Sequence, residues 1–322
     1  MKVTIFTPTF NRADTLPRLF VSLQQQTDKR FEWLIVDDGS TDNTAQLIHN
    51  FTCEKNDFEI RYYFQEHGGK PRAQNLAIDL ARGELFITCD SNKYLSRNAV
   101  ELIIGMAEGI RDVPMMCGVG GYRADFSGKP FGGSMQLDGR SFVDCTRLEG
   151  HLYNIVGDKA SAFFTDVLKN YKSPEYPDEF FVSESVWLIP MAIDGYKTRW
   201  FPEILIYGEY TADGLTKQGA NSRAGHTRNF QGFLHQLRVE IMARGTKAMR
   251  FLIYEAIDIA KEKDIPMKSL AIKIGCSQSH LIYLKAIRYM HKLYGSISRL
   301  VKKFIGSTAT SYLKKLMHRQ EQ

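Results

Sequence analysis

The sequence is poor in cysteine and contains no long hydrophobic run. Five cysteines are scattered over 322 residues and none forms a C-x-x-C pair, so a disulfide framework or a cysteine-ligated zinc site is disfavoured and reduced thiols are expected. No uninterrupted apolar stretch approaches the length of a membrane-spanning helix, and no signal-peptide-like run follows Met1. These features predict a cytoplasmic protein.

Two common nucleotide-binding motifs are also missing. The P-loop spacing G-x-x-x-x-G-K-[ST] does not occur, and no G-x-G-x-x-G follows the first predicted strand, residues 3–6. Hydrolysis of nucleoside triphosphates and dinucleotide binding are therefore disfavoured. With 43% hydrophobic residues, the chain is long enough for one large α/β domain with an appendage, or for two modest domains.

Acidic residues are absent from one long segment, which runs from Ile265 to Gln320. Residues 223–322 contain 19 Lys/Arg against 6 Asp/Glu, a net charge of +13, whereas residues 1–222 carry −7. A bias of this length predicts that the C-terminal region faces an anionic partner, either membrane lipid or nucleic acid.

The first hundred residues alternate between strand-like and helix-like segments, which predicts βαβ units and an α/β fold with a mostly parallel sheet. Leu16, Leu19, Phe20 and Leu23 have the spacing of a buried helix face. A glycine-rich stretch at 112–150 predicts strands and turns facing a substrate, and helical spacing dominates from residue 228. The predicted strands are 3–6, 31–36, 60–64 and 85–88.

Two carboxylates follow the second predicted strand. Asp37 and Asp38 precede a glycine turn at what would be the carboxyl end of a buried parallel strand, where open α/β sheets bind ligands. A carboxylate there can accept the imide N–H of a uracil ring. The alternative is that one of them caps the turn into a helix that begins near Thr44.

A glycine turn with two cations connects the third predicted strand to the helix that follows it. His67-Gly68-Gly69-Lys70-Pro71-Arg72 opens a helix with proline near its first position, and a helix N-terminus with nearby Lys and Arg suits a diphosphate. The alternative is a surface turn with solvated charges. Asp90 follows the strand at 85–88, where its carboxylate is suited to hold a hard divalent cation against phosphate oxygens.

These segments occur in an order that resembles family 2 glycosyltransferases over roughly the first 215 residues. The resemblance is carried by residues 7–12 (TPTFNR), 36–42 (VDDGSTD), 69–75 (GKPRAQN), 81–84 (ARGE) and Asp90. It implies an inverting, nucleotide-sugar-dependent enzyme with the GT-A fold, of the kind that builds bacterial surface polysaccharides. It also implies a division into a nucleotide-sugar-binding half (1–110), an acceptor half (111–218) and a basic helical region (219–322).

The resemblance assigns a set of donor-site residues, for a donor expected to be a UDP-sugar: Pro8, Thr9, Arg12, Asp37, Asp38, Lys70, Arg72, Asn75, Asp90 and Ser91. It also implies a divalent cation, Mn²⁺ or Mg²⁺, at a D-x-D motif formed by Asp90 and Asn92. Where the family commonly reads Asp-Ser-Asp-Asp, however, this chain reads Asp90-Ser91-Asn92-Lys93. Asn92 would then ligate through its carbonyl, or Lys93 would supply part of the metal charge, or the protein would bind its donor without catalysis.

The acceptor half should contain a carboxylate that takes the proton from the attacking hydroxyl. By the resemblance, this base is Glu184, with Asp158 as the second choice, and the acceptor is a saccharide or a lipid-linked saccharide. Many relatives have Glu-Asp where this chain has Glu184-Ser185. The alternative is that Glu184 orients a neighbouring loop.

The C-terminal region combines an apolar stripe that includes Leu284 and Ile287 with a cationic side that includes Lys285. We expect it to bind an anionic membrane surface and place the enzyme at the inner face of the membrane. Packing against a second copy is the alternative. Residues 269–281 also resemble a helix-turn-helix, but the stripe continues past them, so nucleic-acid binding is disfavoured.

Overall fold

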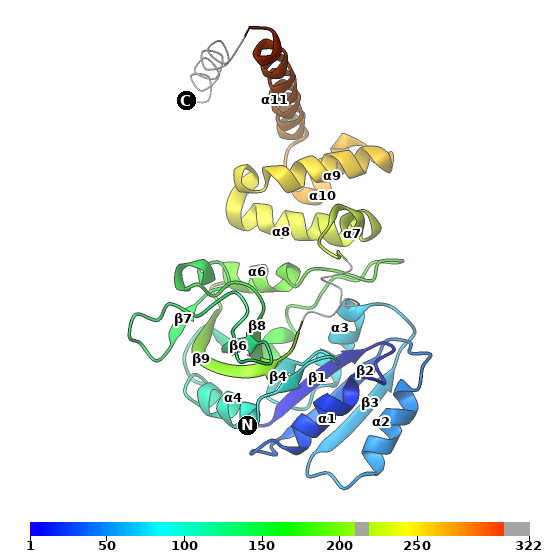
Figure 1. Ribbon diagram of the computed structural model, residues 1–322, viewed down its shortest axis with the longest axis vertical. Coiled ribbons are helices and arrows are strands. Elements are labelled where there is room, and N and C mark those ends of the chain that lie inside the picture. The colour runs from blue at the N-terminus through cyan, green and yellow to red at the C-terminus, as the bar shows by residue number, and fades with distance from the viewer. Residues whose placement is uncertain (210–218, 306–322) are drawn as a thin grey trace. The chain divides into compact units, whose positions relative to one another are not determined.

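The computed structural model describes residues 1–209 and 219–305 (Figure 1). The chain divides into two compact units, Met1–Ala243 and Arg244–Gln322. The predicted boundary at 218/219 adjoins residues that are not described, and α7 (Arg223–Arg228) lies within the first unit. As a functional division, that boundary stays a prediction.

One mixed sheet of nine strands, among the described residues, forms the centre of the first unit. Its first half is parallel, with the order β3-β2-β1-β4. All seven residues of β2 are buried, as expected for a parallel strand that is covered on both faces. The predicted α/β fold and the four predicted strands are confirmed as β1 (Val3–Thr9), β2 (Phe31–Asp37), β3 (Glu59–Phe64) and β4 (Leu85–Thr88).

The second half of the sheet is mixed. β8 runs antiparallel to β4, and β6 runs antiparallel to β8, so β6 has the same direction as β4. β9 is parallel to β6, while β5 and β7 pair with β9 in the antiparallel sense. These strands are β5 (Tyr94–Leu95), β6 (Met116–Ala124), β7 (Val143–Cys145), β8 (Lys159–Phe164) and β9 (Lys197–Tyr207).

Helices cover both faces of the sheet. The residues predicted to form one helix face, Leu16 to Leu23, are buried in a core that also contains side chains of α2 and α4. On the other face, α3, α5 and α6 pack on Phe6, Leu34 and Val36. The bounds are α1 (Leu16–Gln24), α2 (Thr44–Cys53), α3 (Lys70–Leu80), α4 (Ala99–Glu108), a 3₁₀ turn (Gly150–Tyr153), α5 (Thr165–Leu168), α6 (Ser185–Ile193) and α8 (Phe230–Ala248).

The second unit is helical and contains α9 (Arg250–Glu262), α10 (Met267–Ile274) and α11 (Gln278–Ile305). Gly275, with φ +74°, ends α10. Leu281 and Leu284 are buried within this unit. None of the helices among the described residues is both long and apolar enough to cross a bilayer.

The stripe predicted on α11 is therefore partly wrong. Leu284 was expected on a face available to lipid or protein, but it packs inside the unit because α11 uses this side against α9 and α10. Other members of the predicted stripe, among them Tyr283, Met290 and Leu293, are exposed. Together with Ile282 and Tyr289 they form an exposed apolar set on one side of the helix.

Candidate active site

The predicted site residues gather at one edge of the sheet. β1, β2 and β4 are parallel, so the residues that follow them, including Asp38 and Asp90, emerge at the same edge. β6 has the same direction as β4, which brings Arg123, near its carboxyl end, to that edge. β8 runs the opposite way, so Asp158, directly before it, also lies there. Ligands bind at this edge in open α/β sheets.

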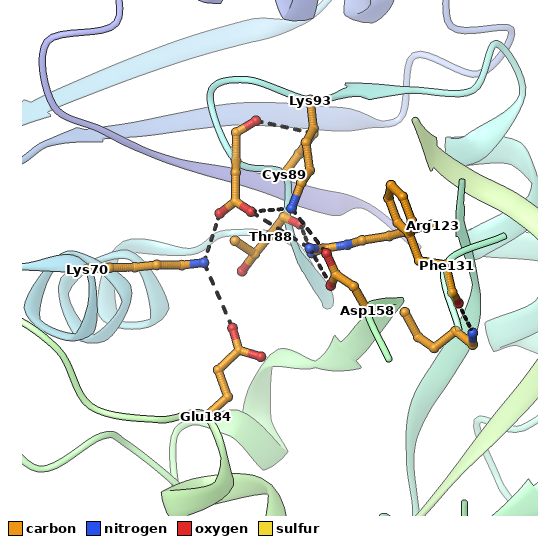
Figure 2. A network of polar contacts seen from close by, with 10 residues as sticks. Lys70, Thr88, Cys89, Lys93, Arg123, Phe131, Asp158 and Glu184 are labelled. Atoms are coloured by element: carbon orange, nitrogen blue, oxygen red, sulfur yellow. Dashed lines mark hydrogen bonds and ion pairs between the residues drawn. The ribbon is translucent and has the colours of Figure 1, made fainter. Parts of the chain in front are cut away.

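Three cations and three carboxylates meet at this edge, and we call them the charge cluster (Figure 2). Lys70 Nζ lies 2.8 Å from Asp90 Oδ1, and Lys93 Nζ lies 2.8 Å from Asp90 Oδ2. Arg123 Nη1 is 3.7 Å from the same Oδ2. The cluster comprises Lys70, Lys93, Arg123, Asp90, Asp158 and Glu184.

The other two carboxylates bind the same cations. Arg123 Nη1 donates to Asp158 Oδ1 at 2.9 Å, and Lys93 Nζ lies 3.4 Å from Asp158 Oδ2. Glu184 Oε1 is 3.9 Å from Lys70 Nζ. The side chain of Glu184 is 57% exposed, against 25% for Asp158. Glu184 is thus the most accessible carboxylate of the cluster and the most loosely paired.

The pairing fixes the charges of the cluster. Burial raises the pKa of Asp90, but the charges of Lys70, Lys93 and Arg123 outweigh it and hold the pKa well below its ordinary value. The pKa of Asp158 is lowered in the same way by Arg123 and Lys93 against burial. Burial lowers the pKa of Lys70, yet the nearby carboxylates raise it more. Both aspartates are therefore ionised near neutral pH.

Asp38 holds the loop that precedes α3. Its Oδ1 accepts hydrogen bonds from Gly68 N at 2.8 Å and from Gln65 Nε2 at 2.6 Å. Its Oδ2 accepts one from Gly69 N at 2.8 Å and lies 2.8 Å from His67 Nδ1. This carboxylate therefore orders the loop 65–69 directly before the first cluster lysine.

Asp37 stabilises the turn that follows β2. Its Oδ1 accepts a hydrogen bond from Ser40 N at 2.8 Å, and its Oδ2 accepts one from the Tyr62 hydroxyl at 2.9 Å. Asp37 is fully buried. The sequence left open whether a carboxylate here binds a base or caps a turn, and Asp37 and Asp38 both hold backbone.

Gly69 is fixed by its surroundings. It has φ +88°, and a Cβ at this position would lie 2.1 Å from the carbonyl oxygen of Phe180. Only glycine fits both the backbone conformation and this close approach. The loop thereby reaches the acceptor half while Lys70 opens α3 with Pro71 in the first turn.

Arg72 and Asn75 do not join the charge cluster. Arg72 Nη2 donates to the carbonyl of Tyr176 at 3.0 Å. Asn75 Nδ2 donates to the carbonyl of Ser173 and to Glu175 Oε1, each at 2.8 Å. Both side chains thus connect α3 to the segment at 173–176. In the structure these side chains hold α3 against that segment. Their contact with the ribose and diphosphate stays a prediction.

The residues assigned to the nucleoside lie at the end of β1. Pro8 is in register with Val36 of β2. Thr9 is buried, and within the described chain its hydroxyl has no hydrogen-bond partner. Arg12 N donates to Thr44 Oγ1 at 3.0 Å. A buried hydroxyl without a partner costs free energy unless a ligand or water satisfies it, so Thr9 is suited to bind a nucleoside.

Aromatic rings continue the nucleoside side of the site. Phe10 stacks on His67 with 4.4 Å between ring centroids, and His67 stacks on Phe180 at 4.7 Å. Phe10 and Phe180 are 42% and 45% exposed. Exposed aromatic rings are suited to stack on a nucleobase.

The residues around Asp90 do not fit a divalent cation. Mg²⁺ and Mn²⁺ need oxygen ligands at about 2.0–2.2 Å, but each Asp90 oxygen is already bound by an ammonium group. Lys93 stands where the resemblance would have a carboxylate, and Ser91 is buried beside it. Among the described residues, no group of three His, Cys, Asp or Glu side chains could hold a metal. The assignment of Asp90 and Asn92 as metal ligands thus lacks a suitable donor set.

Sequence reasoning missed Arg123, the central cation of the cluster. A cavity of about 120 Å³ adjoins it and is also lined by Thr88, Asp158, Glu184 and Trp187. No motif marks this arginine, because it is a single cation in a glycine-rich strand. Its significance follows only from the direction of β6, which two antiparallel pairings determine.

Comparison with known proteins gives a consistent family match. Residues 4–171 match the family described as "Glycosyl transferase family 2". A GalNAc(5)-diNAcBac-PP-undecaprenol beta-1,3-glucosyltransferase of Campylobacter jejuni is 26% identical over 247 residues, which cover 74% of each chain. A chondroitin synthase of Pasteurella multocida is 34% identical over 115 residues, 36% of this chain and 12% of that protein.

Solved structures show the same fold. Staphylococcus aureus TarS 1–349 in complex with UDP-GlcNAc has a TM-score of 0.60 at 17% identity, covering 89% of this chain and 88% of that chain. The Pyrobaculum calidifontis mannosyltransferase PcManGT, in complex with GDP-Man and Mn²⁺, has a TM-score of 0.53 at 16% identity, covering 97% and 84%. The sheet flanked by helices and the charge cluster at its edge thus lie in a fold shared with these transferases.

Proposed function

The chain belongs to glycosyl transferase family 2 and is a glycosyltransferase that uses a nucleotide sugar, and we propose that its donor is a UDP-sugar and its acceptor a lipid-linked saccharide. The charge cluster is the observation that supports this best, because it joins three cations to an accessible carboxylate beside a cavity. The cations suit a diphosphate, and the carboxylate suits proton abstraction from an acceptor hydroxyl.

In this proposal the donor lies along the carboxyl ends of β1, β2 and β4. The nucleoside occupies the side of Thr9 and Phe10, where a buried hydroxyl has no partner in the described chain and a ring is exposed. The diphosphate lies against Lys70 and Arg123. Asp38 acts indirectly, because it holds the loop that positions Lys70.

Glu184 is the proposed base, and its greater exposure and looser pairing support it over Asp158. Asp158 is bound by two cations, Arg123 and Lys93, at 2.9 and 3.4 Å, and its lowered pKa makes it a weak proton acceptor. Glu184 is more exposed, lines the cavity and lies at the start of α6. Transfer with inversion follows if this carboxylate takes the proton of the hydroxyl while the hydroxyl oxygen bonds to the anomeric carbon from the side opposite the diphosphate. The bond from that carbon to the phosphate oxygen then breaks, and the nucleoside diphosphate leaves with the bonding electrons.

The names of two similar proteins support the donor and acceptor classes. The Campylobacter relative is named for a lipid-linked oligosaccharide, and TarS is solved with UDP-GlcNAc. A thermal-shift screen with UDP, GDP, CDP and dTDP tests the donor. UDP should raise the melting temperature most. Stabilisation by another nucleotide alone would change the donor class, whereas stabilisation by none would remove the donor site.

A catalytically inactive, donor-binding protein is the second candidate, because Lys93 stands at a position where the resemblance has a carboxylate. The two are separated by incubating the chain with UDP-glucose or UDP-GlcNAc and measuring release of UDP. Slow hydrolysis above the rate without protein would support the enzyme. Tight UDP binding without turnover, even with lipid-linked acceptors, would support the binding protein.

We further propose that the second unit holds the enzyme at the inner face of a membrane. Its basic sequence, which has no acidic residue from Ile265 to Gln320, and the exposed apolar residues of α11 support this, since each Lys or Arg near an anionic lipid surface contributes about 1 kcal/mol. Flotation of the full chain with anionic vesicles should be lost in a Tyr283→Ser/Met290→Ser variant. Self-association without lipid binding would instead favour a homo-oligomer, and binding to duplex DNA would favour the helix-turn-helix alternative.

A further inference from the structure

We propose that this transferase binds the diphosphate of its donor through Lys70, Lys93 and Arg123 without a divalent cation, with Lys93 in the place of the metal. The inference rests on the proposed donor site. It concerns how that site neutralises phosphate charge, and it replaces the metal that the resemblance implies at Asp90 and Asn92.

Lys93 already binds the carboxylate of Asp90, which a metal would need as a ligand. Its Nζ lies 2.8 Å from Asp90 Oδ2 and 3.4 Å from Asp158 Oδ2, so one ammonium group bridges two carboxylates. The other oxygen of Asp90 is bound by Lys70 at 2.8 Å. A cation that binds Asp90 at metal distances would have to displace at least one ammonium group. It would also enter a space that three positive charges already surround.

The surrounding fold accommodates the Lys93 side chain closely. Lys93 N donates to the carbonyl of Asp90 at 2.9 Å, and this turn directs the side chain back toward the carboxylate. The side chain is only 10% exposed. Gly208 packs against its stem, and a Cβ at Gly208 would lie 2.6 Å from Lys93 Cγ. A solvated surface lysine would need no such glycine.

The charge cluster has hydrogen-bond donors left for a phosphate. Arg123 Nε is buried and, within the described chain, has no hydrogen-bond acceptor. Its Nη1 is used by Asp158. Each lysine ammonium carries three N–H groups, and Asp90 takes one from each of the two lysines. Diphosphate oxygens would satisfy Arg123 and accept further charge-assisted hydrogen bonds.

The charges of the whole cluster cancel, because three cations face three carboxylates. Glu184 is the most loosely paired of these carboxylates, at 3.9 Å from Lys70 Nζ. Asp90 and Asp158, which are paired at close range, therefore leave one positive charge among the three cations that a diphosphate can pair with. The competing interpretation is an inert ion-pair network that stabilises the fold, in which case Lys93 would not affect nucleotide affinity.

Calorimetric titration of the full chain with UDP distinguishes these possibilities. UDP should bind with the same Kd, within about threefold, in EDTA and with Mn²⁺ or Mg²⁺. Lys93→Met should weaken binding about tenfold or more in EDTA, because hydrogen bonds to charged groups are worth at least that factor. Lys55→Met is the matched control, since Lys55 is exposed between α2 and β3, and it should bind UDP like the wild type.

A second variant keeps the test decisive if Lys93→Met fails to fold. Asn92→Asp/Lys93→Asp introduces the Asp-Ser-Asp-Asp sequence that the resemblance has at this place, and UDP binding by this variant should become dependent on Mn²⁺. Wild-type binding that requires Mn²⁺, or unchanged affinity in a folded Lys93→Met, would overturn the inference alone. No binding of any nucleoside diphosphate in either buffer would overturn the donor site and the inference with it.

Discussion

Replacing Asp38 with alanine should destabilise the first unit as well as weaken donor binding. The carboxylate accepts backbone hydrogen bonds from Gly68 and Gly69, each at 2.8 Å, and both glycines are buried. A buried donor left without an acceptor costs about 1–3 kcal/mol. Two such donors, with some water entering the vacated space, give an expected loss of about 2–4 kcal/mol in the free energy of unfolding.

Urea unfolding followed by tryptophan fluorescence measures this loss. All three tryptophans belong to the first unit, so the signal does not report on the second. Asp57→Ala, at an exposed position, is the control and should stay within about 0.5 kcal/mol of wild type. UDP affinity of folded Asp38→Ala should fall by about tenfold, because the loop before Lys70 must then be ordered by the ligand. An unfolding midpoint equal to that of wild type would refute the role assigned to Asp38.

Three further predictions follow from the site. Glu184→Gln should lower turnover by about 10²–10⁴-fold while UDP affinity stays within about threefold, because the amide keeps the shape of the base but cannot accept the proton; unchanged turnover would move the base to another residue. Gly69→Ala should lower the free energy of unfolding in urea by more than about 2 kcal/mol, since φ is +88° and the new Cβ would meet a carbonyl oxygen. The control Gly105→Ala, in an open helical position, should leave this free energy unchanged or raise it by up to about 1 kcal/mol. Because the folded state lowers the pKa of Asp90, the ion pairs of Asp90 should stabilise the fold fully above the unfolded pKa of about 3.9 and lose that contribution as the pH falls further. The difference in unfolding free energy between wild type and Asp90→Asn should therefore be constant from pH 7 to about 5 and shrink only below about 4. A difference that shrinks already at pH 6 would contradict a lowered pKa.

The first half of the fold could be predicted because its signals are local. Runs rich in β-branched and aromatic residues marked β1 to β4, and the spacing from Leu16 to Leu23 marked α1. Local periodicity also placed Asp38 and Asp90 after their strands. Since parallel strands end at one edge of the sheet, residues far apart in the sequence could be assigned to one site.

The contacts within the site could not be predicted, because they depend on partners distant in the sequence. Arg123 joins the site only because β6 runs parallel to β4 through an intervening antiparallel strand. Arg72 and Asn75 lie beside Lys70 in sequence, yet their side chains bind residues about a hundred positions later. Leu284 fits an apolar stripe, but periodicity does not say which neighbour covers each side of a helix.

A crystal structure of the full chain with UDP would test the central claim most directly. The account predicts that the diphosphate lies within hydrogen-bond distance of Lys70 and Arg123 at the carboxyl ends of β1, β2 and β4, with the uracil next to Thr9 and Glu184 facing the open end of the diphosphate. A nucleotide bound at any other part of the chain, with the charge cluster unchanged, would contradict it.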